Sequence, residues 1–344
     1  MPQKETASDR YTAASGLASA VGEAVKAYGI DVEPIYAALG LDPAVFQDLT
    51  GRVSLDRLCR LLETCALITK DEAFALKSID VFRPGSSGPY GFGLMAAPTA
   101  LDMFRFMAAH HSYVSEKSYS KLTVNEQGAE FAWTFSPLIV KRDQFVDMNM
   151  GLITMRLRDV LGAAVDAIEI GMERPKPRNI TPFRERLPRR VNFERRINSI
   201  RLPAELFNVE NPKGDPRLFQ LMDLQCTALS PARPDTPDFA DELKEFILTR
   251  IAESSINLAE AADYFHVSER TLQRRLSEGG TSLADLRDEV RRDLAQKLLS
   301  ETDFSAAEIA LRLGYSQASA FTRSTMRWFG ITPREYRKAN VSAA

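Results

Sequence analysis

Two kinds of apolar periodicity divide the chain near residue 230. In the first part, "VSLDRLCRLLETCALI" places its apolar residues on one helical stripe behind Ser54, a residue type that caps helix N-termini. "SYSKLTVN" and "AEFAWTFS" alternate apolar and polar residues on either side of "EQG", which predicts a β-hairpin. After residue 239 only helical spacing occurs. We therefore expect an α+β domain followed by an all-α domain.

Further patterns complete the first domain. Helices are predicted in "GLASAVGEAVKAYGI", around "ALDMFRFMAAHH", over residues 143–162 and in "PRLFQLMDLQCTAL", whereas "VDAIEIGM" predicts a strand. "RPGSSGPYGFG" is rich in glycine and proline and predicts a loop. "SPARPDTPD" has three prolines and little apolar content, which is typical of a linker. The expected boundaries are residues 1–229, a linker at 230–238, and residues 239–344.

The second domain contains two pairs of short helices, each with the pattern of a helix-turn-helix. In the first pair, Asn257 and Glu260 have capping-box spacing, and Ser268 precedes the second helix, which ends at Gly279. In the second pair, Ser305 and Glu308 repeat the capping box. We expect Gly314 to form the turn of this pair, Ser316 to cap its second helix and Gly330 to end it.

A continuous helix is predicted between the two pairs. "SLADLRDEVRRDLAQKLLS" carries leucines and a valine at helical spacing over about eighteen residues, which span ~27 Å at ~1.5 Å per residue. Such a rod can hold two recognition helices about one DNA turn apart, ~34 Å. This arrangement predicts binding to double-stranded DNA.

The residues expected to read bases lie on the second helix of each pair. Arginine and glutamine pair bidentately with guanine and adenine edges in the major groove. Arg270, Gln273 and Arg274 share one helical face, and Ser319, Arg323 and Arg327 share another. An exposed helix with arginine and glutamine is common by itself, but two capped pairs joined by one helix point specifically to DNA.

Residues 240–338 resemble the DNA-binding domain of the AraC/XylS family of bacterial transcription regulators. The resemblance rests on "SERTLQRRL", "GTSLADLRDEVRRDLAQKLL" and "AAEIALRLGYSQASAFTRSTMRWFGITPREYR". It implies that Arg270, Gln273 and Arg274 contact DNA from the first recognition helix, and that Ala318, Ser319 and Arg323 contact it from the second. Ala318 departs from the family pattern, because its methyl group can touch a thymine but cannot hydrogen-bond to a base.

The first domain resembles the arabinose-binding-like effector domain that accompanies this DNA-binding domain. "TALDMFRF" and "RVNFERRINSIRLPAELFN" carry the resemblance. It implies a homodimeric transcription regulator controlled by a small-molecule effector. The operator and the sign of regulation, activation or repression, stay open.

The same stretch departs from the family by its arginines. "RERLPRR" at residues 184–190 is followed by Arg195, Arg196 and Arg201, and we expect it on a loop and a following strand. Three interpretations remain: surface ion pairs with nearby glutamates, auxiliary DNA contact, or capture of an anionic effector. Arginine binds phosphate bidentately and stacks on flat rings, which suits a nucleotide.

The arginine spacing narrows the choice of effector. Arg186 and Arg190 form an RxxxR motif that resembles the one in PilZ-type receptors for cyclic di-GMP, although the companion (Asp/Asn)-x-Ser-x-x-Gly motif is absent. Cyclic di-GMP is therefore the expected effector, with Arg184, Arg186, Arg189, Arg190 and Arg195 as its site. In the alternative, the effector is a small metabolite such as an amino acid, sugar or fatty acid, and the arginines are structural.

Composition adds limits to this reading. The 344 residues exceed one typical core, which favours two domains. The net charge is only −2, so any field that attracts DNA is local to the helices. The chain has no run of ~18 apolar residues, its start is polar, and its three cysteines lack CxxC spacing. We therefore expect a cytoplasmic protein with reduced thiols and no membrane partner.

Catalytic motifs are missing from the sequence. Walker A, GxSxG, HExxH and Cys–His metal patterns do not occur, so we expect no enzymatic activity, no cofactor and no metal. An alternative of another class is a DNA alkylation-repair regulator with a reactive cysteine. That chemistry needs a thiolate in a polar, basic setting, whereas Cys59 and Cys65 lie on an apolar helical stripe.

Overall fold

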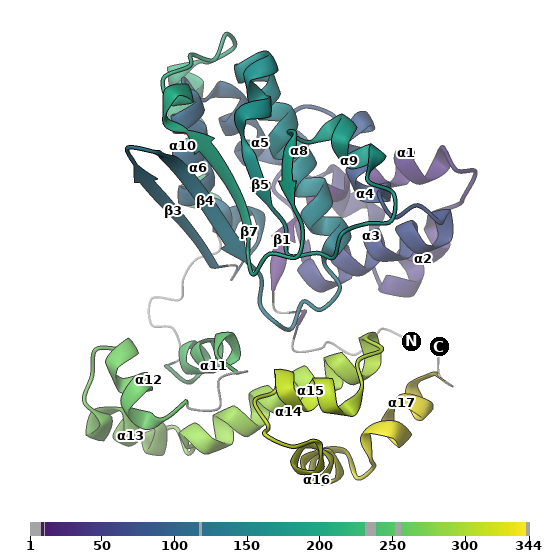
Figure 1. Ribbon diagram of the computed structural model, residues 1–344, viewed down its shortest axis with the longest axis vertical. Helices are drawn as coiled ribbons and strands as arrows, with labels where there is room; N and C mark the ends of the chain where they lie inside the picture. The colour runs from purple at the N-terminus through teal and green to yellow at the C-terminus, as the bar shows by residue number, and fades with distance from the viewer. Residues whose placement is uncertain (1–7, 10, 117–118, 231–238, 252–255, 342–344) are drawn as a thin grey trace. The chain divides into compact units, whose positions relative to one another are not determined.

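The computed structural model describes residues 8–9, 11–116, 119–230, 239–251 and 256–341 (Figure 1). The chain forms two compact units, one of residues 1–135 and 141–231, and one of residues 136–140 and 232–344. Apart from Ser230, the linker expected at residues 230–238 lies outside the described residues. The first unit is a mixed α/β fold and the second is helical.

A five-stranded sheet organises the first unit. Its strands are β3 (Tyr119–Asn125), β4 (Gly128–Thr134), β5 (Glu169–Gly171), β6 (Arg190–Asn192) and β7 (Asn198–Pro203), in the order β3-β4-β7-β5-β6. All neighbours are antiparallel except β5 and β6, which are parallel. The hairpin predicted around "EQG" is confirmed as β3 and β4.

One face of this sheet is packed by helices. Phe131, Ile200 and Ile170 pair across β4, β7 and β5, and each is at most 1% exposed. The helices of the unit are α1 (Val21–Lys26), α2 (Glu33–Leu39), α3 (Leu55–Thr69), α4 (Phe74–Ser78), α5 (Gly88–Ala96), α6 (Ala100–Ala109), α7 (His111–Val114), α8 (Asp143–Leu161), α9 (Thr181–Arg186) and α10 (Pro216–Leu229). A second, two-stranded sheet joins β1 (Thr12–Ala14) to β2 (Arg52–Ser54).

Local capping explains where several of these helices begin. Ser54 Oγ accepts a hydrogen bond from the backbone N–H of Arg57 at 3.3 Å, which confirms the predicted start of α3. Asp215 caps α10 in the same way, accepting from Arg217 N at 2.9 Å. The helices predicted at residues 143–162 and in "PRLFQLMDLQCTAL" are confirmed as α8 and α10.

Two expectations for the first unit are wrong. The single helix expected before Gly29 is split into a 3-10 turn, Ser15–Ala18, and the short helix α1. The loop expected in "RPGSSGPYGFG" becomes α5 from Gly88 onward, because Pro89 fits the first turn of a helix. Gly88 has a φ of +64°, and a Cβ there would lie 2.0 Å from the carbonyl oxygen of Leu49, so the close packing requires glycine.

A buried ion pair connects α8 to the segment that follows β5. Arg174 binds Asp147, whose side chain is fully buried, and its guanidinium also lies 5.2 Å from the ring of Phe183 on α9. Burial raises the pKa of Asp147 well above its usual range, while Arg174 opposes that shift. The segment before the arginine-rich stretch is thus fixed to the central helix.

The second unit contains seven helices among its described residues. They are α11 (Phe239–Thr249), α12 (Leu258–Tyr264), α13 (Glu269–Glu278), α14 (Leu283–Glu301), α15 (Ala306–Arg312), α16 (Ala318–Phe329) and α17 (Pro333–Val341) (Figure 1). The long helix expected between the two pairs is confirmed as α14. Its predicted stripe Leu286, Val290, Leu294 and Leu298 is at most 6% exposed. The sequence reading did not identify α11, which packs against α14 and buries Leu243 completely.

The Arg174–Asp147 pair generates a stability prediction. Arg174→Met leaves the Asp147 carboxylate buried without its cation, so the free energy of unfolding of the first unit should fall by about 3–5 kcal/mol. Urea unfolding followed through Trp133 fluorescence, in a Trp328→Phe background, measures this change. Arg178→Met is the matched control, because Arg178 is 95% exposed and its ion pair with Glu72 should contribute about 0–1 kcal/mol. Equal losses for both variants would contradict the assigned role.

Candidate nucleic-acid interface and effector site

The first helix-turn-helix pair consists of α12 and α13. Asn257 Oδ1 accepts from Glu260 N at 2.9 Å, and the Glu260 carboxylate accepts from Asn257 N at 3.4 Å, which confirms the capping box. The turn passes through His266, which adopts a φ of +53°. Ser268 Oγ then accepts from Thr271 N at 3.2 Å and starts α13. These local bonds set the angle at which α13 leaves α12.

One face of α13 is buried and the other is open. Leu272 and Leu276 are at most 3% exposed, whereas Arg270, Gln273 and Arg274 are all exposed. Among the residues that the structure describes, Arg270 has no ion-pair partner. Arg274 contacts only Glu278, at 3.4 Å, in a pair whose two side chains are more than 60% exposed. Such a pair separates at little cost, so the face is free to contact a ligand.

The second pair, α15 and α16, repeats this arrangement. Ser305 Oγ accepts from Glu308 N at 3.2 Å, and Ser305 N donates to Glu308 at 2.7 Å, as the sequence predicted. The turn is at Gly314, with a φ of +70°, and a Cβ there would lie 2.3 Å from the carbonyl oxygen of Ile251. Arg291 of α14 holds this turn by donating to the carbonyls of Leu313 and Gly314 at 2.9 and 3.1 Å.

The face predicted on α16 is only partly available. Ser319 and Arg323 are exposed, and Ala318 is half-buried. Arg327, which the sequence placed with them, binds Asp288 of α14, and the indole of Trp328 donates to the same carboxylate at 2.8 Å. Arg327 therefore helps to fix α16 on α14. The predicted cap at Ser316 is wrong, because Gln317 occupies the N-cap position and its side chain makes no capping bond.

The connecting helix and the last helix complete the second unit. Ser282 caps α14 by accepting from Asp285 N at 3.1 Å, and the 19 residues of α14 span about 28 Å. Thr332 and Glu335 form a reciprocal cap of α17, with bonds of 3.3 and 2.8 Å. The two recognition helices α13 and α16 are thus carried by one rigid helix.

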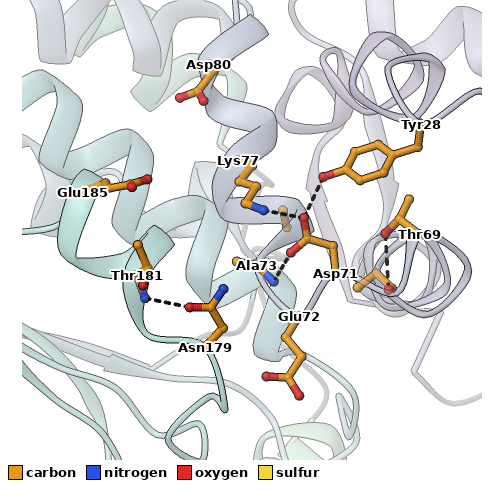
Figure 2. A network of polar contacts seen from close by, with 12 residues as sticks. Tyr28, Thr69, Asp71, Glu72, Ala73, Lys77, Asp80, Asn179, Thr181 and Glu185 are labelled. Carbon is orange, nitrogen blue, oxygen red and sulfur yellow. Dashed lines mark hydrogen bonds and ion pairs between the residues drawn. The ribbon is translucent and has the colours of Figure 1, made fainter.

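The arginine-rich stretch starts on a short helix. Arg184 and Arg186 lie in the last turn of α9, so the loop expected for them is wrong, whereas Arg190 begins β6 as expected. Pro182 in the first turn and the buried ring of Phe183 favour the helix. Asn179 accepts a hydrogen bond from Thr181 N at 3.1 Å just before it (Figure 2).

Two of the five predicted effector arginines already have carboxylate partners. Arg186 donates to both oxygens of Asp80, at 2.5 and 3.3 Å, and to Glu185 at 3.0 Å. The hydrogen bond to Asp80 raises the pKa of Arg186. Figure 2 labels Asp80 and Glu185 on the two neighbouring segments that this contact joins. Arg189 pairs with Asp166 at 2.8 Å, although its side chain is 84% exposed.

The other three predicted arginines are unpaired within the described part of the chain. Arg184, Arg190 and Arg195 are exposed, and no acidic side chain lies within ion-pair distance of them. Arg195 is in a turn fixed by two backbone bonds, from Glu194 N to Arg174 O and from Arg195 N to Met172 O, at 3.1 and 2.9 Å. The structure therefore separates the predicted set into two anchored and three available arginines.

Two of the available arginines, Arg190 and Arg195, adjoin the sheet face opposite the packed one. The strand register places Arg190, Glu169 and Arg201 in one row, and Asn192, Gly171 and Ser199 in the next. A Cβ on Gly171 would lie 2.8 Å from Ser199 Oγ and 3.5 Å from Arg195 Cγ, so the Arg195 stem crosses the sheet beside Ser199. Ser199 and Arg201 are not among the five predicted effector residues, although the two-residue spacing in "INSIRL" places both on one strand face.

Other chemistries find little support in the described residues. No group of three or more His, Cys, Asp or Glu side chains there could hold a metal ion, and no described helix is both long and apolar enough to span a membrane. All three cysteines are buried, and burial raises the pKa of Cys65 and of Cys226 to about 12. These two thiols stay protonated at neutral pH, which disfavours the reactive-cysteine alternative.

Comparison with known proteins identifies the family of this chain. The family model described as the arabinose-binding domain of AraC transcription regulators matches residues 29–211, more than half of the chain. The chain belongs to the AraC family of transcription regulators. A helix-turn-helix domain model matches residues 261–339, which contain both recognition helices. This AraC-family regulator thus combines an N-terminal effector-binding domain with a C-terminal DNA-binding domain.

Individual relatives agree with the family. An ornithine utilization regulator of Pseudomonas aeruginosa is 23% identical over 323 residues, which cover 94% of this chain and 95% of the relative. The regulator VirS of Mycobacterium tuberculosis is 48% identical over 76 residues, 22% of each chain. The crystal structure of the transcriptional regulator CdpR from P. aeruginosa has 20% identity, covers 89% of this chain and 96% of that one, and gives a TM-score of 0.39.

The open face of α13 generates a binding prediction. Arg274→Ala should weaken binding to DNA selected by the wild type by about 1–3 kcal/mol and relax the preference at one base pair. Binding measured across single-base variants of the selected site tests both effects. Arg292→Ala removes an arginine of α14 that pairs with Asp293 and belongs to neither recognition helix, so it is the control and should keep the base preference. A wild-type base preference in Arg274→Ala would exclude this side chain from base reading.

Proposed function

We propose that this AraC-family regulator reads double-stranded DNA through α13 and α16. The observation that carries the proposal is the repetition of two capped helix-turn-helix pairs on one 19-residue helix. Arg270, Gln273 and Arg274 of α13 are exposed on one face and are assigned to base contacts. On α16, Ser319 and Arg323 contact bases or phosphates, and Ala318 contributes at most an apolar contact.

The DNA-bound form is proposed to be a homodimer joined through α10. Leu218, Leu221 and Leu224 of this helix are 38%, 49% and 60% exposed. Leucines spaced three residues apart on one helix favour a partner that is also apolar, and a second copy of the chain supplies the same helix. A dimer offers two DNA-binding domains to paired half-sites, which raises the effective concentration of the second domain.

The effector is proposed to be an anionic nucleotide, with cyclic di-GMP as the best single candidate. Arg184, Arg190 and Arg195 are exposed and have no acidic partner in the described residues, so their charge is available. Ser199, Asn192 and Arg201 add hydroxyl, amide and guanidinium groups on the same sheet face. These groups can meet phosphate oxygens and a guanine edge at once.

We assign different roles to the arginines of the RxxxR motif and its surroundings. Arg190 and Arg195 are assigned to direct contact with the nucleotide. Arg186 positions α9 through its bidentate contact with Asp80, and Arg189 supplies charge from a pair with Asp166 that solvent can open. The binding energy favours the dimeric, DNA-competent state only if that state binds the nucleotide more tightly.

A second candidate effector is a small amino acid. The relative that aligns with 94% of this chain is named an ornithine utilization regulator. The first unit also has a cleft of about 720 Å³ between α1, α2 and residues 81–86, a size typical of ligand sites. Lys26, Arg83 and Asp31 line it without an ion-pair partner among the described side chains. Both signs of charge in one cleft suit a zwitterion.

Calorimetry decides between the two effectors. Cyclic di-GMP should bind wild-type protein in a salt-sensitive manner. Arg190→Ala/Arg195→Ala should weaken binding by about tenfold or more, because each removes a charge-assisted contact. Arg178→Ala, exposed in the same segment, is the matched control and should bind as wild type. Absence of heat at micromolar protein and nucleotide, together with heat from ornithine, would favour the amino acid.

The proposed α10 interface predicts coupled losses of assembly and DNA affinity. Leu221→Glu should convert the dimer to a monomer in sedimentation equilibrium and weaken binding to a two-half-site operator much more than binding to one half-site. Thr227→Glu adds the same charge to an exposed position of the same helix that lies off the leucine face, and this variant should stay dimeric. A Leu221→Glu protein that remains dimeric would remove α10 from the interface. The isolated fragment 239–344 lacks α10, so we also expect it to bind the two-half-site operator far more weakly than the whole chain does.

A further inference from the structure

An aromatic cavity lies inside the first unit, between the sheet and its helices. It encloses about 40 Å³, more than the ~10–15 Å³ that one water molecule needs. The side chains that line it come from α5, α7, β4 and α8, and they include Tyr90, His111, Phe131, Trp133, Phe145 and Asn149. None of the arginines assigned to the nucleotide lines this cavity.

His111 is the polar group that this cavity leaves unexplained. The residue is 7% exposed, and its Nε2 has no hydrogen-bond partner among the residues described. Its ring lies 5.3 Å from that of Phe131 and 6.0 Å from that of Trp133, both of which also line the cavity. A buried polar atom without a partner destabilises the fold unless water or a ligand completes it.

The groups around His111 determine which kind of ligand could hydrogen-bond to its Nε2. Burial lowers the pKa of His111 to about 4, so the imidazole is neutral near pH 7 and offers one donor and one acceptor. Arg156 is the charged residue among those lining the cavity, and it pairs with Asp159 at 3.4 Å. A charged ligand would lose its hydration here without gaining a free counter-charge.

We propose that this cavity is a second ligand site, which takes the apolar end of an uncharged organic molecule bearing one hydroxyl or carbonyl group. The apolar part contacts the aromatic rings, and the oxygen hydrogen-bonds with His111 Nε2. This site is independent of the nucleotide and amino-acid proposals, since it shares no assigned residue with either.

The position of the cavity connects it to α10. His110, the residue before His111, places its Nε2 at 2.6 Å from Asp223 of α10. The ring of Tyr90 in the cavity wall lies tilted at 5.7 Å from that of Phe106, and the ring of Phe106 lies 5.3 Å from that of Phe219 on α10. A ligand that moves His111 or Tyr90 therefore acts on the residues that hold the helix on which the proposed dimer depends.

Fluorescence can test the site because the chain has only two tryptophans. In the full chain with Trp328→Phe, Trp133 in the cavity wall is the single indole. 3-Bromo-1-propanol, whose bromine quenches indole on contact, should quench it with saturation. 3-Bromopropionate has a similar size and a negative charge at neutral pH, and it should quench without saturation. Linear quenching of equal slope by both probes would overturn the proposal and leave water as the only occupant.

Variants identify the hydrogen-bonding group. His111→Phe should weaken binding of the bromoalcohol ~3–10-fold, and His111→Gln, which keeps a polar amide, should recover part of the loss. Glu130→Gln is the matched control, since Glu130 is exposed on the face of β4 that points away from the cavity, and this variant should bind the probe as wild type. In wild-type protein, which has three histidines, the His111 ring nitrogen signal should shift on titration with 1-propanol. An unchanged His111 signal at saturating 1-propanol would overturn the assignment without relying on any variant.

Discussion

The contact between Arg174 and Asp147 fixes the geometry of the whole arginine-rich region. Arg174 is held in the core by a carboxylate on α8 and by the ring of Phe183 on α9. Its carbonyl oxygen accepts the N–H of Glu194, which orients the turn that presents Arg195. Arg174 therefore anchors both the short helix α9 and the turn that carries Arg195. Two of the segments that set the spacing of the exposed arginines thus depend on one buried side chain.

A comparable dependence holds in the DNA-binding domain, where α14 organises both helix-turn-helix pairs. Arg291 fastens the second turn through two backbone carbonyls, and Asp288 receives both Arg327 and the Trp328 indole. Polar side chains of α14 thus act as fixed supports, while α13 and the outer face of α16 leave polar groups exposed to solvent. This difference between paired side chains on α14 and exposed ones on α13 and α16 explains how the domain can be nearly neutral in net charge. Its positive charge is still exposed locally on the recognition helices.

Sequence reasoning succeeded where the determining interactions are local. The capping boxes at Asn257 and Ser305 and the cap at Ser54 depend on residues three positions away, and the structure has all of them. Sequence reasoning failed where tertiary packing determines a helix boundary or the partner of a side chain. Ser316 has a suitable side chain, yet the chain enters α16 one residue later, at Gln317. Partners distant in sequence, such as Asp80 for Arg186 and Asp288 for Arg327, leave no periodic signal, so anchored and available arginines look alike in the sequence.

The length of α14 has a consequence for how such a regulator can change its target. An α-helix rotates by about 100° and advances about 1.5 Å with each residue. Inserting or deleting one residue in α14 would turn α16 away from the side of the duplex that α13 faces, while hardly altering the distance between them. The number of residues in α14 therefore sets the rotation of one recognition helix relative to the other. In the proposed binding mode, a new operator is therefore reached by exchanging side chains on α13 and α16 rather than by changing the length of α14.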